Sequence, residues 1–156
     1  MIYWEIDSDA PRHRVASRVL VLVRMSEESE RLKKRTMRFA LDVCGLIKQL
    51  PIEEPGPLVR RQLARAATGV AFNYRSSCRA RSHTEFTARI GVVAEEADES
   101  QGWLEFIDDA QLIAGERLRR LRAESDELVA IFSASVGTAR EKEQQAKAKR
   151  PRRSRS

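Results

Sequence analysis

The sequence is poor in the residues that interrupt helices or join loops covalently. Its 156 residues include only seven glycines, five prolines and two cysteines, and one third of the chain (33%) is charged. This composition favours long helices over a β-rich fold. Cys44 and Cys78 both fall in stretches expected to be helical. They exclude a disulfide framework and indicate buried, reduced thiols in a cytoplasmic protein.

Long apolar runs are also missing. The run at residues 19–23 is only five residues long, whereas a transmembrane helix needs about 20 apolar residues. Acidic residues near the start, Glu5, Asp7 and Asp9, differ from the basic start of a signal peptide. We therefore expect no membrane segment. The net charge of +6 suits an acidic partner such as nucleic acid, although much of the excess lies in the last residues.

Groups that could carry catalysis are sparse. The two histidines are His13, near the start, and His83, in a predicted turn. Cys78 and His83, even with Cys44 as a third ligand, fall short of the four closely spaced ligands of a zinc site. A di-iron bundle would need Glu-x-x-His motifs, and the sequence has none. We expect no metal, cofactor, small-molecule substrate or enzymatic activity.

The composition divides the chain into three segments. Residues 1–25 are predicted to form an N-terminal extension, either a disordered arm or a lone edge strand, because residues 15–23 are apolar and β-branched without a helical period. Met25 opens a new acidic stretch, so it is also a candidate for the true start of the protein. Residues 26–140 are predicted to form the folded domain, and residues 141–156 a disordered basic tail.

Four amphipathic helices are predicted within the domain. Their apolar residues recur at intervals of three and four, which places them on one buried stripe per helix. Ser82 followed by Glu85 predicts a capping box at the start of the third helix. The pattern predicts an all-α, antiparallel up-down four-helix bundle. The expected helices cover about 29–50, 57 to the turn at 80–84, from just after Ser82 to beyond Ile107, and 115–139.

The second and third helices carry opposite charge. Six arginines and no carboxylate lie between Leu58 and Arg81, whereas eight carboxylates and a single arginine lie between Glu85 and Asp109. The basic helix face is open to three interpretations: a solvated surface, a track for phosphates, or a contact with the acidic helix of another copy. The arginines are Arg60, Arg61, Arg65, Arg75, Arg79 and Arg81.

Aromatic and apolar residues outside the predicted core stripes favour the third interpretation. Phe72 lies among the arginines, and Trp103 and Phe106 lie on the far side of the acidic helix. Apolar groups in such positions usually indicate that another surface covers them. We expect arginine–carboxylate pairs around an apolar centre between copies. The interface candidates are Phe72, Val92, Glu95, Glu99, Trp103 and Phe106. Candidates for contact with nucleic acid are the six arginines above with Lys149, Arg150, Arg152 and Arg153 of the tail.

Several local motifs resemble a known family. Residues 73–82, reading Asn-Tyr-Arg-Ser-Ser-Cys-Arg-Ala-Arg-Ser, residues 95–100, reading Glu-Glu-Ala-Asp-Glu-Ser, and the Trp-Leu-Glu at 103–105 carry the resemblance. They are similar to the bacterial four helix bundle protein family. Its members include proteins encoded by intervening sequences within 23S rRNA genes. The resemblance covers about residues 29–135. Accessory proteins of diversity-generating retroelements are more distantly similar.

The resemblance implies an antiparallel bundle that assembles as a cyclic homo-oligomer, a pentamer, with no known enzymatic activity. The retroelement relatives engage nucleic acid through a basic surface, which implies a scaffold for nucleic acid, and the family context favours RNA as the partner. The sequence thus predicts a non-enzymatic oligomeric scaffold that associates with nucleic acid through its second helix and its tail. The alternative is a protein–protein interaction adaptor that binds no nucleic acid.

Overall fold

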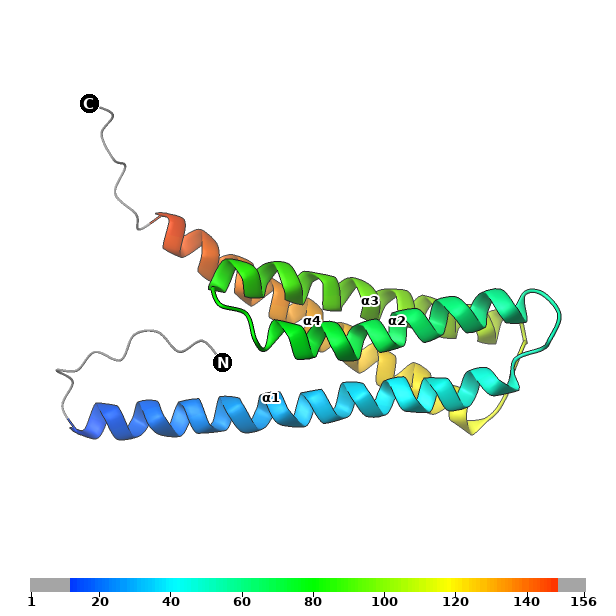
Figure 1. The fold of residues 1–156 in the computed structure, drawn as a ribbon, viewed down its shortest axis with the longest axis horizontal. Coiled ribbons are helices and arrows are strands. Elements are labelled where there is room, and N and C mark those ends of the chain that lie inside the picture. The colour runs from blue at the N-terminus through cyan, green and yellow to red at the C-terminus, as the bar shows by residue number, and fades with distance from the viewer. Residues whose placement is uncertain (1–11, 149–156) are drawn as a thin grey trace, which may run out of the picture.

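The protein is an antiparallel bundle of four helices. The computed structural model describes the backbone of residues 12–148 and the side chains of residues 26–148. Figure 1 shows consecutive helices running in opposite directions, with no strand in the described part of the chain. The predicted all-α up-down architecture is confirmed. The elements are α1 (Arg12–Leu46), the 3-10 helix η1 (Ile47–Gln49), α2 (Gly56–Ser77), α3 (His83–Asp109) and α4 (Glu116–Ala148).

The first helix begins earlier and the last helix ends later along the chain than the sequence predicted. The edge strand considered for residues 15–23 is wrong, because α1 begins at Arg12 and runs through them. A continuous apolar run has no period that distinguishes a strand from a helix. Extending an existing helix also costs less free energy than nucleating a new element. Residues 141–148 of the predicted tail belong to α4, where Lys147 pairs with Glu143 at 2.9 Å. Residues 1–11 and 149–156 lie outside the described residues.

The buried stripes of the helices meet in one apolar core. Val43 of α1, Leu63 of α2, Leu104 of α3 and Phe132 of α4 are completely buried. The ring of Phe132 also lies 5.4 Å from that of Tyr74, measured between centroids. Since the intervals of three and four residues predicted these stripes, the core follows from the periodicity of the sequence.

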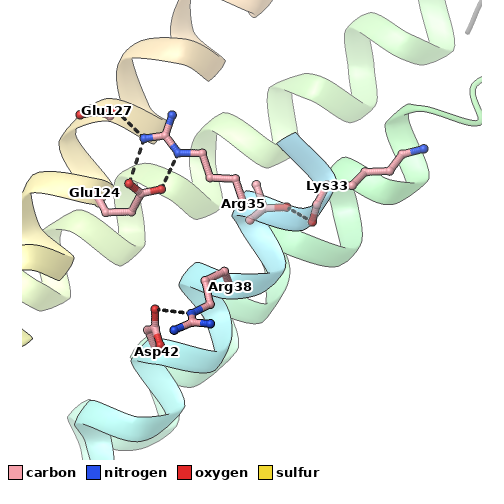
Figure 2. A network of polar contacts seen from close by, with 7 residues as sticks. Lys33, Arg35, Arg38, Asp42, Glu124 and Glu127 are labelled. Carbon is pink, nitrogen blue, oxygen red and sulfur yellow. Dashed lines mark hydrogen bonds and ion pairs between the residues drawn. The ribbon is translucent and has the colours of Figure 1, made fainter. Parts of the chain in front are cut away.

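A forked ion pair connects the first and last helices (Figure 2). Arg35 of α1 donates from Nε and Nη2 to the two carboxylate oxygens of Glu124 in α4, at 2.6 and 2.9 Å, and also contacts Glu127. The hydrogen bonds to Glu124 raise the pKa of Arg35 above its ordinary value. Such bidentate pairs fix orientation as well as distance. Arg35 therefore sets how α4 lies across α1.

The connection between α1 and α2 depends on Arg60 and Gly56. Arg60 donates to the carbonyl oxygens of Ile47 at 3.1 Å and Leu50 at 3.0 Å, in and just after η1. Gly56 is buried against the backbone of Pro51, so that a Cβ atom here would overlap the Pro51 carbonyl group. Only glycine allows the chain to return this tightly.

We expect Gly56→Ala to lower the free energy of unfolding by about 1–3 kcal/mol, because the added methyl group overlaps backbone that cannot rotate away. Urea denaturation followed by circular dichroism measures the change. Gly137→Ala is the matched control, since nothing lies within 4 Å of a Cβ at this helical position. It should stabilise the protein by about 0.5–1 kcal/mol. Equal stability of the two variants would contradict a steric role for Gly56.

Candidate oligomer and nucleic-acid interface on helices two and three

Polar contacts at two levels show the register between α2 and α3. Arg65 of α2 pairs with Glu99 of α3 at 3.3 Å. Further along, Arg89 of α3 donates to the carbonyl oxygen of Ser76 of α2, also at 3.3 Å. The two helices are antiparallel, so these contacts show which residues lie level with each other along the whole seam.

The register brings exposed apolar residues together in two clusters on the outside of the seam. Phe72 and Val92, which are 59% and 42% exposed, lie level with each other and form the Phe72 cluster. Leu58 lies level with Phe106, and these two with half-buried Trp103 form the Trp103 cluster. The rings of Trp103 and Phe106 meet edge to face, with centroids 5.7 Å apart. Four predicted interface residues therefore lie on one side of the molecule.

The charged residues between the clusters are partly paired within the chain. Sequence reasoning expected Glu99 to pair with an arginine of another copy, but the structure pairs it with Arg65 of its own α2. Glu99 also accepts a hydrogen bond of 3.4 Å from the indole Nε1 of Trp103. The reason is geometric, since an antiparallel neighbour places Arg65 next to Glu99 before any second copy arrives. Glu95 remains exposed and has no ion pair among the described residues.

The six arginines predicted to contact nucleic acid divide into two groups. Arg60 is half-buried and holds backbone carbonyls, and Arg65 is paired with Glu99. The other four are exposed, and within the part of the chain that the structure describes none of them forms an ion pair. These four are Arg61, Arg75, Arg79 and Arg81. Lys149, Arg150, Arg152 and Arg153 lie outside the described residues.

The residues weighed as metal ligands go to separate contacts. His83 Nε2 lies 2.8 Å from the carbonyl oxygen of Ala139 in α4, and Cys78 Sγ lies 3.3 Å from Ser29 Oγ in α1. Cys44 and Cys78 are not joined by a disulfide. Among the described residues, no three His, Cys, Asp or Glu side chains are grouped to hold a metal ion. None of the described helices is long and apolar enough to cross a membrane.

Comparison with known proteins places the bundle in a family. Residues 28–134 match the family model of the 23S rRNA-intervening sequence protein. The chain belongs to this family. A crystal structure of a protein of unknown function from the S23 ribosomal protein family of Bacteroides thetaiotaomicron VPI-5482 shares the fold, with a TM-score of 0.61 and 24% identity over 67% of this chain and 96% of that one. No curated protein matches. Neither the family description nor that structure's name indicates a catalytic activity.

The matched span of this chain contains both apolar clusters and a carboxylate that sequence reasoning missed. Glu96 of α3 lies over Gly69 of α2, where a Cβ atom would come within 2.6 Å of the carboxyl group. Its Oε2 is buried without a hydrogen-bond partner. Burial raises the pKa of Glu96, as do the charges of Glu99 and Glu95, against an opposing effect of Arg65. The only signal in the sequence was a glycine inside a predicted helix.

We expect Glu96→Gln to stabilise the protein at neutral pH, because the folded state must hold this carboxylate charged in a place that favours the neutral form. The pKa is raised on folding, so the penalty is present above the folded pKa and disappears as the pH falls through it. The gain from Gln should therefore shrink toward acid pH. Urea denaturation at a series of pH values measures it.

Glu105→Gln serves as the control, because Glu105 is exposed on the same helix. It should change the free energy of unfolding by less than about 0.5 kcal/mol at any pH. A gain from Glu96→Gln that is the same at every pH, or no gain at pH 7, would mean that the charge of Glu96 is not destabilising.

Proposed function

We propose that this protein is a non-enzymatic scaffold that assembles with copies of itself and associates with RNA. The observation that carries the proposal is the outer face of the α2–α3 seam, where two apolar clusters flank a charged centre. Phe72 is 59% and Phe106 41% exposed in a single chain. Side chains of this size outside a well-formed core favour a covering surface.

Assembly is the first half of the proposal. Burying apolar surface contributes about 25 cal/mol per Å², so burial of the two apolar clusters would stabilise a contact between copies. Glu95 is exposed and available to an arginine of a neighbour such as Arg61. A head-to-tail contact of α2 in one copy with α3 in the next generates a ring where the rotation between neighbours closes. Five subunits per ring is the number that the family resemblance implies.

Association with RNA is the second half. The guanidinium groups of the exposed arginines match phosphate oxygens, and each neutralised phosphate releases counterions. The description of the family refers to intervening sequences of 23S rRNA, which favours RNA over DNA. Two cysteines without a disulfide are in keeping with a cytoplasmic location.

A protein–protein adaptor is the second candidate, since the same apolar clusters suit a protein partner. The dependence of binding affinity on salt concentration distinguishes the two functions. About four phosphate contacts on single-stranded RNA predict a roughly 50-fold loss of affinity between 50 and 200 mM salt. The affinity for a protein partner that binds through the apolar clusters should change much less between about 50 and 200 mM salt.

We expect Trp103→Glu to lower the mass of the assembly, because a charge would lie inside the Trp103 cluster, one of the two apolar parts of the contact. Light scattering after size-exclusion chromatography measures the mass. Helicity should stay near that of the unchanged protein, since Trp103 lies at the margin of the core. Leu41→Glu is the control: Leu41 is 61% exposed on α1, away from the seam, so its replacement should leave the mass unaltered. A mass unaffected by Trp103→Glu would remove this residue from the interface.

We expect the double change Arg75→Glu and Arg79→Glu to weaken binding to single-stranded RNA and DNA more than tenfold in a low-salt gel-shift assay. Both side chains are exposed, so their reversal replaces attraction to phosphate by repulsion without disturbing the core. Circular dichroism controls for folding. Undiminished binding would assign the contact to other basic residues and take it away from α2.

A further inference from the structure

One end of the bundle gathers segments from all four helices. Ser29 Oγ of α1 lies 3.3 Å from Cys78 Sγ at the end of α2, and His83 Nε2 at the start of α3 lies 2.8 Å from the Ala139 carbonyl oxygen of α4. Figure 1 shows the α2–α3 turn, the first part of α1 and the last part of α4 at this end. We call residues 26–34, 72–90 and 136–148 the turn end, and the other described side chains, 35–71 and 91–135, the far end.

The two ends carry opposite net charge. The turn end has ten Lys or Arg and six Asp or Glu, a net charge of +4. The far end has ten Lys or Arg and fourteen Asp or Glu, a net charge of −4. The number of basic residues is equal, so the difference comes entirely from carboxylates. The chain continues from α4 at the turn end with five more Lys and Arg in residues 149–156.

Ion pairs within each end leave these net charges unchanged, but they determine which basic side chains are available. At the turn end Lys33, Arg89 and Lys147 pair with Glu30, Glu85 and Glu143. Arg75, Arg79, Arg81 and Arg140 at the turn end are exposed, and none of them has an ion pair within the described residues. At the far end many arginines are already neutralised by a carboxylate of their own chain. Such pairs are Arg65 with Glu99, Arg119 with Glu116 and Arg122 with Asp108.

The outermost parts of the two ends are too far apart for their charges to cancel. The 22 residues of α2 make a helix about 33 Å long. The Debye length is only about 8 Å at physiological ionic strength, so a phosphate near one end interacts little with the other. A polyanion therefore meets an attractive turn end and a repulsive far end.

We propose that the turn end is the surface that contacts nucleic acid, with RNA phosphates held by Arg75, Arg79, Arg81 and Arg140. This inference rests on the proposed association with RNA and locates it. It takes Arg61, at the far end of the same helix, out of the contact. In a cyclic assembly the turn ends of all copies occupy equivalent positions, so that a single RNA meets several of them at once.

Two double variants with the same change in net charge test the location. Arg79→Glu with Arg140→Glu alters the turn end, and Arg117→Glu with Arg120→Glu alters exposed residues of the far end. Binding of the full-length proteins to a fluorescently labelled single-stranded RNA of about 20 nucleotides is followed by anisotropy from 50 to 200 mM salt.

The turn-end pair should weaken binding at least tenfold at 50 mM salt. It should also make the slope of log K against log salt shallower by about 1.4, the equivalent of two phosphate contacts. The far-end pair should stay within about threefold of the unchanged protein with the same slope. The corresponding glutamine pairs should show the same order with smaller effects, and circular dichroism checks that every variant is helical.

Each outcome decides the proposal. Equal binding by the two double variants, whether weakened or not, overturns the location and leaves the RNA association standing. Failure of the unchanged protein to bind RNA at 50 mM salt overturns the proposed association itself, and the location with it.

Discussion

The close antiparallel packing of α2 on α3 is the constraint on which the surface of this protein depends. Ala66 and Ala67 are completely buried, and Gly69 lets the carboxyl group of Glu96 lie directly against α2. Small residues permit this approach, and in the resulting register Arg65 lies beside Glu99 and pairs with it. The apolar side chains outside the core come together because of that register. A shift of one helical turn would separate Phe72 from Val92.

The same packing determines which charges stay available. Carboxylates of α3 neutralise arginines that lie beside them, and backbone carbonyls in and just after η1 hold Arg60. What is left is a set of exposed arginines concentrated where α2 ends. The charge of the bundle therefore changes along its length, from acidic at the far end to basic at the turn end.

Much of the fold could be predicted because helical periodicity is a local property. The capping box at the start of α3 formed nearly as expected: Ser82 accepts from the amide of Glu85 at 3.1 Å, and Glu85 accepts from the amide of Arg81, one residue before the cap. The start of α1 was misplaced because an apolar β-branched run has no period that distinguishes strand from helix. The candidate site could be predicted only in part, since the sequence identified its residues but not the residues that each of them contacts in the fold.

The sequence by itself determined the helices, their buried faces and the opposite charges of α2 and α3, because each of these depends on residues a few positions apart. Only the tertiary structure decided that Arg65 neutralises Glu99 and that Glu96 is left against Gly69. It also decided that segments from four helices form one basic end. Those facts depend on the register between helices, which arises from side-chain packing across the whole bundle and is not encoded in the period of any single helix.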